Sequence, residues 1–117
     1  MLRARLPRPR VALLLAALAL APVLAGASDF VLRGRVYAQQ TRVHDLYIGV
    51  NDNYVTVTGD GSTDLDCWIF DGDGNLVDSD TDNTDDCVLS TPGIGQHRLV
   101  IKNFGSVYND YVVARRR

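Results

Sequence analysis

Residues 54–70 read Y54-V-T-V-T-G-D-G-S-T-D-L-D-C-W-I-F70, two alternating runs joined by a glycine- and aspartate-rich turn. In the first run Val55 and Val57 alternate with threonine and tyrosine. In the second, leucine, cysteine and isoleucine alternate with aspartate, tryptophan and phenylalanine. A period of two in β-branched and aromatic residues predicts strands that turn one face inward.

The same pattern continues over the rest of residues 28–117, which hold twelve valines and nine aromatic residues but only two alanines. This composition disfavours helix. We expect about eight short strands, near residues 30–38, 42–49, 53–58, 65–70, 75–79, 86–90, 96–103 and 108–114, followed by a solvated tail. Such spacing without crossover helices predicts an all-β, antiparallel two-sheet β-sandwich of the jelly-roll or immunoglobulin-like kind. A closed barrel is the alternative.

Residues 1–27 differ from the rest of the chain. Four arginines precede an apolar run from Val11 to Leu24, and Ala25-Gly26-Ala27 follows. This order is typical of a secretory signal peptide, with cleavage expected after Ala27. A retained membrane anchor is the alternative, but the run is shorter than the roughly 20 apolar residues of a spanning helix. We therefore expect one domain, residues 28–117, exported to the periplasm or the medium and free of the membrane after cleavage.

The expected mature chain is acidic. All its acids are aspartates, fourteen against eight arginine and lysine residues, which gives a net charge of −6. A surface that binds nucleic acid needs clustered cations, so we expect no nucleic-acid partner. Ninety residues also allow only one small core, too little for a two-domain enzyme.

Two cysteines, Cys67 and Cys87, lie in the exported part, where disulfides persist. We expect them to pair and to stabilise the fold by about 3 kcal/mol through closure of the loop between them. A redox or metal-binding pair is the alternative, which the missing C-x-x-C spacing disfavours.

Ten aspartates and no lysine or arginine lie between residues 60 and 86. Calcium is the candidate cofactor of this segment because it prefers converging oxygen ligands. The candidate ligands share strand faces, and they are Asp64, Asp66, Asp78, Asp80 and Asp82. The alternative is that the carboxylates splay into solvent. An EF-hand loop starting at Asp71 fails because Leu76 takes the glycine position, so we expect a hairpin turn at 71–75. The register of the strand that follows is open.

Trp68 and Phe70 lie on the strand face opposite Leu65, Cys67 and Ile69. If that face is exposed, they could form an aromatic platform with Tyr54 on a neighbouring strand and bind a sugar or a polypeptide. If a loop covers them, they form a satellite core. No catalytic motif accompanies these residues. His44 and His97 have no metal-ligand spacing, and the serines lack a nucleophile elbow, so we expect no enzyme activity.

Residues 59–76, G59-D-G-S-T-D-L-D-C-W-I-F-D-G-D-G-N-L76, resemble the centre of the bacterial pre-peptidase C-terminal domain, with its D-L-D strand and glycine-asparagine turn. The likeness extends over residues 40–114. It implies a β-sandwich that serves as a non-catalytic binding or accessory module, partnered with a secreted peptidase or an extracellular polymer. The chain departs from that family at His97, where an aromatic residue is usual, and at both cysteines.

Two rival functions follow. One is a calcium-binding sandwich ordered by metal, although the acidic segment that supplies ligands in calcium-binding relatives is reduced here to Asp29. The other is a secreted peptidase inhibitor or chaperone.

Overall fold

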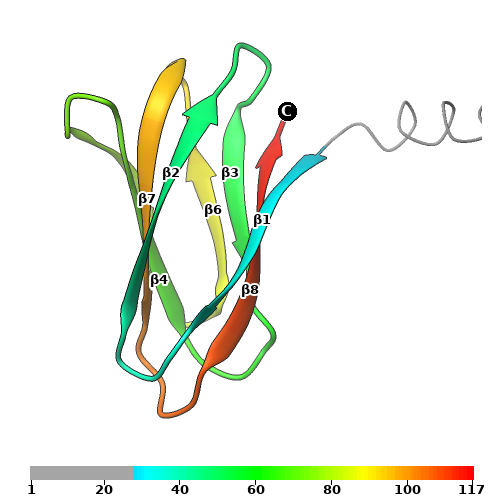
Figure 1. Cartoon of the computed structure of the whole chain (residues 1–117), viewed down its shortest axis with the longest axis vertical. Coiled ribbons are helices and arrows are strands. Elements are labelled where there is room, and N and C mark those ends of the chain that lie inside the picture. Colours follow the sequence, from blue (N-terminus) through cyan, green and yellow to red (C-terminus); the bar gives the residue numbers. More distant parts are fainter. Residues whose placement is uncertain (1–27) are drawn as a thin grey trace, which may run out of the picture.

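The computed structural model describes residues 28–117, which form eight strands (Figure 1). The strands are β1 (Ser28–Val36), β2 (Thr41–Ile48), β3 (Tyr54–Thr58), β4 (Leu65–Phe70), β5 (Leu76–Asp80), β6 (Asp86–Ser90), β7 (Gly95–Asn103) and β8 (Asn109–Arg116). The predicted signal peptide and its cleavage after Ala27 lie outside the described residues. Within the described part, no helix has the length and apolar character to cross a membrane.

The strands form two four-stranded sheets that face each other, with the orders β1-β8-β3-β6 and β2-β7-β4-β5. All strand pairs are antiparallel, and β1 pairs with β8, β2 with β7, β3 with β6 and β4 with β5. The chain is thus one long hairpin, with its tip between β4 and β5, coiled into two layers. This is jelly-roll topology, so the predicted all-β sandwich is confirmed.

Strand β8 extends further along the chain than expected. β8 continues to Arg116, where we expected a solvated tail from residue 114. Its last residues pair with β1 on one side and with β3 on the other. The tail prediction was wrong because a central strand in a sheet is held from both sides, which local charge does not reveal.

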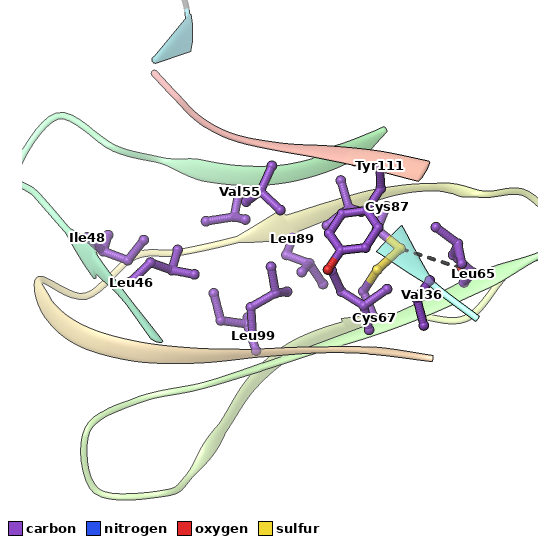
Figure 2. Packing of buried hydrophobic residues seen from close by; sticks show 14 residues of the cluster. Val36, Leu46, Ile48, Val55, Leu65, Cys67, Cys87, Leu89, Leu99 and Tyr111 are labelled. Atoms are coloured by element: carbon purple, nitrogen blue, oxygen red, sulfur yellow. Dashed lines mark hydrogen bonds between the residues drawn. A yellow bond between two sulfur atoms is a disulfide. The ribbon is translucent and has the colours of Figure 1, made fainter. Parts of the chain in front are cut away.

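The core lies between the sheets and follows the predicted alternation, with Leu65, Cys67 and Ile69 of β4 fully buried. The disulfide between Cys67 and Cys87 is present, and it joins β4 in one sheet to β6 in the other. Figure 2 shows the ring of Tyr111 beside this disulfide, between the two layers. The predicted cross-link is therefore confirmed, and it ties the two sheets together inside the core.

The register of β5 explains two of its aspartates. A bulge between Ile69 and Phe70 shifts the pairing, so that Asp78 lies opposite Ile69 and Asp80 opposite Cys67. Both positions face inward, but β5 is the edge strand of its sheet. The two carboxylates reach across to β6, the edge strand of the other sheet. Asp80 accepts the backbone N–H of Val88 at 2.9 Å, and Asp78 accepts that of Ser90 at 2.7 Å.

The opposite side of the sandwich, between β1 and β2, is bridged by cations. Arg42 of β2 donates through Nη1 to the backbone carbonyl of Arg35 in β1, at 2.7 Å. Arg115 of β8 donates to the carbonyl of Tyr47 in β2, at 2.9 Å. Inward charges on or beside edge strands occupy backbone groups that would otherwise pair with another chain. Acidic side chains do this on one side and basic side chains on the other.

Candidate functional site

The outer surface of the β2-β7-β4-β5 sheet carries an apolar band between charged residues. Across the strands, Val43 pairs with Val100, which pairs with Trp68. Trp68 and Val100 are half-buried, whereas Val43 is 51% exposed. We call this surface the Trp68 face, and its members are Val43, Asp45, Tyr47, Asp66, Trp68, Phe70, Leu76, Gln96, Arg98, Val100 and Lys102.

Phe70 continues the Trp68 face in the next row, between Arg98 of β7 and Leu76 of β5. Leu76 is 55% exposed and Tyr47, beyond that row on β2, is 51% exposed. The two alternatives for the β4 aromatics were an open platform and a satellite core under a loop. The rings are partly covered by their neighbours in the sheet and partly open to solvent, so they contribute to an accessible surface.

Tyr54 does not join this surface. It lies on β3, which pairs with β6 and β8 in the other sheet, and it faces outward beside Ser90 and Arg116. The structure therefore separates Tyr54 from Trp68 and Phe70 by the full thickness of the sandwich. The three-residue platform is not formed, because β3 and β4 follow each other in the chain but belong to different layers.

The five candidate calcium ligands are not gathered into one site. Asp78 and Asp80 each use an oxygen on the backbone of β6, as described above. Asp82 accepts the N–H and hydroxyl of Thr84 in its own turn. Within residues 28–117, no three histidine, cysteine or acidic side chains are placed to hold one metal ion. The five residues as a set therefore do not fit calcium.

Asp64 and Asp66 differ from the other three. Each has a buried Oδ1 without a hydrogen-bond partner among the described residues. The pKa of Asp66 is raised, first by burial and then by the negative charges of Asp64, Asp82 and Asp80. Both burial and the neighbouring negative charges therefore disfavour the ionised form of Asp66.

A pocket of about 490 Å³ lies at one end of the Trp68 face, between the 71–75 turn and β7. Phe70, Gln96, Arg98 and Asp45 line it, together with Asp71 and Gly72 of the turn. Arg98 donates through Nε to Asp45 Oδ1 at 3.0 Å, which ties β7 to β2 across the sheet. The sequence did not reveal this group, because the pairing of β2 with β7 brings together residues that are 53 positions apart.

The turn beside this pocket is built by Asp71. Its Oδ1 accepts the backbone N–H groups of Asp73 and Asn75, each at 2.9 Å. These hydrogen bonds lower the pKa of Asp71, and the one from the backbone N–H of Asn75 contributes most. Gly74 adopts a positive φ of 86° in the same turn. The expected hairpin turn is present, and an aspartate holds its shape.

A second unpredicted feature is an aromatic tip at the end of the sandwich where the β1–β2 turn meets the β7–β8 loop (Figure 1). Its exposed side chains are those of Tyr37, Phe104, Val107 and Tyr108. Gln39 has a φ of 62°, uncommon for a residue with a side chain, and its amide donates to the carbonyls of Phe104 and Gly105. Strained conformations of this kind persist where the surroundings fix them.

The side chain of Asn103 also fixes the β7–β8 loop. This side chain is fully buried, donates to the carbonyls of Val36 and Val107, and accepts the N–H of Gly105 at 2.8 Å. The tip is therefore a preorganised structure. No local pattern predicts it, since the hydrogen bonds of Gln39 to the loop and of Asn103 to Val36 join residues more than 60 positions apart.

The histidines have structural roles. His44 of β2 lies 2.5 Å from the hydroxyl of Tyr111, and burial lowers its pKa. His97, which is buried, is hydrogen-bonded through Nδ1 to the carbonyl of Gly95. Within residues 28–117 neither ring is hydrogen-bonded to a serine, threonine or carboxylate.

No known protein family and no curated protein matches the sequence. Solved structures do resemble the fold. The periplasmic inhibitor of g-type lysozyme PliG from Aeromonas hydrophila aligns with a TM-score of 0.51 and 17% identity over 77% of this chain and 87% of that chain. The Yersinia pseudotuberculosis-derived mitogen gives 0.47 and 12%, over 76% and 84%. PliG from Salmonella Typhimurium gives 0.40 and 10%, over 77% and 86%. At 17% identity, the first likeness establishes a shared β-sandwich fold and no more.

Proposed function

We propose that this protein is an exported, non-catalytic binding module of the pre-peptidase C-terminal type, and that it contacts its ligand through the Trp68 face. The observation that carries the proposal is the apolar band of Val43, Val100 and Trp68 on the outer face of the sheet, in which Val43 is exposed and the other two side chains are half-buried. Aromatic and aliphatic side chains left accessible on a stable sheet are typical of contact surfaces.

The edges of the sandwich support the choice of a face. The inward charges of Arg42, Asp78 and Asp80 occupy backbone groups on both long sides. A partner strand would have to displace them, so addition of a strand at an edge is disfavoured. Recognition through side chains on an outer face meets no such obstacle.

The test is retention of residues 28–117 on insoluble polymers, with peptidoglycan, chitin, cellulose and gelatin as separate probes. We expect retention on at least one polymer, and a loss of at least 10-fold in Trp68→Ser. The matched control is Val88→Ser, which removes an exposed apolar side chain from the outer face of the other sheet. Retention on none of the four polymers, or equal retention of the two variants, would contradict the proposal.

A secreted enzyme inhibitor is the second candidate, and the aromatic tip favours it. Phe104 and Tyr108 are each 44% exposed on a loop fixed by Gln39 and Asn103. A rigid convex group of aromatic side chains suits insertion into a concave partner at low entropic cost. Inhibition of a secreted peptidase that is lost in Tyr108→Ser, with polymer binding unchanged, would select this function.

A calcium-dependent form of the binding module is the third candidate. It rests on the unpartnered oxygens of Asp64 and Asp66, whose repulsion a cation would relieve. An ion bound only by the folded state at 100 times its dissociation constant adds about 2.7 kcal/mol of stability. A rise in the thermal midpoint with millimolar calcium but not magnesium, abolished in Asp66→Asn, would select it. Equal midpoints in calcium and chelator would eliminate it.

A further inference from the structure

The pocket at the end of the Trp68 face has a floor, a wall and a polar rim. Its floor is the ring of Phe70, which is half-buried. Its wall is the 71–75 turn, which stands against β7 so closely that a Cβ on Gly72 would lie 3.3 Å from the carbonyl oxygen of Gln96. A volume of about 490 Å³ is within the range of sites for small ligands, roughly 300–1,000 Å³.

The rim offers both donors and acceptors that the protein leaves free. Arg98 uses only Nε on Asp45 Oδ1, so within the described residues its two Nη groups and the second oxygen of Asp45 have no partner. The side-chain amide of Gln96 has no hydrogen-bond partner there either. Arg98 and Asp45 are well exposed, with side-chain exposures of 60% and 67%, so a ligand can reach both. A ring-shaped ligand on Phe70 would meet hydrogen-bonding groups along its edge.

The charges of the pocket select against ions. An anionic ligand would meet the carboxylates of Asp45 and Asp71, and a cationic ligand would meet the guanidinium of Arg98. The Oδ1 of Asp71 is already occupied by backbone N–H groups of its own turn. A neutral ligand with one apolar face and a rim of groups that both donate and accept hydrogen bonds fits the Phe70 floor, the free polar groups of the rim and the mixed charges of the pocket.

We propose that this pocket is a subsite for one neutral pyranose ring of a glycan, stacked on Phe70 and held at its hydroxyl groups by Arg98, Asp45 and Gln96. This inference rests on the proposed function, because it assigns a ligand class to the Trp68 face. The apolar band that runs from Trp68 to Val43 then receives the adjoining parts of the same glycan.

The experiment is titration of residues 28–117 with soluble neutral hexasaccharides of β-1,4-linked glucose, xylose or N-acetylglucosamine, followed by calorimetry and by ¹H–¹⁵N spectra. We expect one of them to bind and to shift the Arg98 Nε–H resonance. Phe70→Leu keeps an apolar side chain in the sheet but removes the aromatic face, and Arg98→Ala removes the rim donors. Each is expected to weaken binding at least 10-fold, whereas Tyr54→Leu on the opposite outer face leaves it unchanged.

Other outcomes separate this inference from the proposed function. If a hexasaccharide binds but Phe70→Leu and Arg98→Ala bind as well as the unmodified chain, the subsite is wrong and the Trp68 face stands. If no hexasaccharide binds and a lysine-rich peptide binds instead, in a salt-sensitive way that Asp45→Asn abolishes, the ligand is a basic polypeptide and the glycan assignment is overturned. If neither a hexasaccharide nor the peptide binds, the subsite is wrong, and retention on the four insoluble polymers decides separately whether the proposed function stands. Dispersed amide spectra of each variant establish that it is folded.

Discussion

Removing the two carboxylates that join β5 to β6 should destabilise the protein and expose an edge strand. Asp78 and Asp80 each accept one backbone N–H group of β6, at 2.7 and 2.9 Å. Hydrogen bonds to charged groups contribute about 1.5–3 kcal/mol each. Both side chains are partly exposed, so the lower end applies and the pair is worth about 3 kcal/mol. A domain of this size shifts by about 4–8 °C per kcal/mol, so the midpoint should fall by at least about 10 °C.

The assay compares thermal midpoints and urea unfolding curves of Asp78→Ala/Asp80→Ala with those of a charge-matched control. Asp73→Ala/Asp86→Ala removes two negative charges from the same segment, and these two side chains accept no hydrogen bond within the described residues. Exposed substitutions of that kind usually change stability by less than 0.5 kcal/mol. If the two double variants unfold at the same midpoint, the carboxylates do not act through the backbone of β6, and the reasoning is wrong.

Two further readouts sharpen the same prediction. Asp78→Asn/Asp80→Asn keeps an oxygen acceptor at each position, so it should retain part of the stability that the alanine variant loses. The alanine variant also leaves the N–H groups of Val88 and Ser90 without their acceptors at a sheet edge. Sedimentation velocity should therefore detect self-association of this variant and none of the control.

Three other perturbations have defined outcomes. Reduction of the Cys67–Cys87 disulfide reopens a loop of sequence separation 20 and should lower the free energy of unfolding by about 3 kcal/mol in urea titrations. Gly34→Ala places a Cβ against the buried ring of Tyr111 and should lower stability by about 1–3 kcal/mol, measured in the same way. Because burial lowers the folded-state pKa of His44 below 6.5, the unfolded chain binds the proton first, and stability is lost as the pH falls from 6.5 through the folded pKa. His44→Gln should flatten that slope, which for one group is at most about 1.4 kcal/mol per pH unit.

Each of these outcomes has its own control. Gly93→Ala adds a Cβ where nothing lies within 4 Å, so it should leave stability unchanged; a loss equal to that of Gly34→Ala would contradict the packing argument. A pH profile of His44→Gln that matches the unmodified chain between pH 5 and 7 would assign the acid sensitivity to other groups. Equal unfolding curves before and after reduction would show that the disulfide does not contribute to the free energy of unfolding.

The fold could be predicted because its signal is local. Alternation in Leu65–Phe70 sets the inward face, and the Asp71–Asn75 turn sets the hairpin, both within a few residues. The pairing of Cys67 with Cys87 needed only the count of cysteines and the expectation that the chain is exported. These features specify strands, faces and one cross-link without any knowledge of strand order.

Only part of the candidate site could be predicted, because which residues meet on it depends on strand order. Trp68 and Phe70 were placed correctly on the outer side of β4, since alternation alone decides that. Tyr54 was assigned to the same surface because it is near in sequence, yet β3 belongs to the other sheet. The sequence predicts Asp78 and Asp80 as metal ligands, because the strand that supplies their actual partners, β6, comes next to β5 only through the arrangement of the two sheets.

The arrangement of charge explains why so acidic a chain can form a sandwich with open faces. Inward carboxylates on β5 are held by backbone N–H groups of β6, and an inward guanidinium on β2 is held by a carbonyl of β1. Charged side chains that would destabilise the centre of the core thus lie at its edges, where each has a hydrogen-bond partner and still contacts water. The sheet edges are then protected without covering either outer face. The proposed ligand contacts then fall on the faces and the loop tips, and the Trp68 face combines accessible apolar side chains with donors and acceptors that have no partner among the described residues.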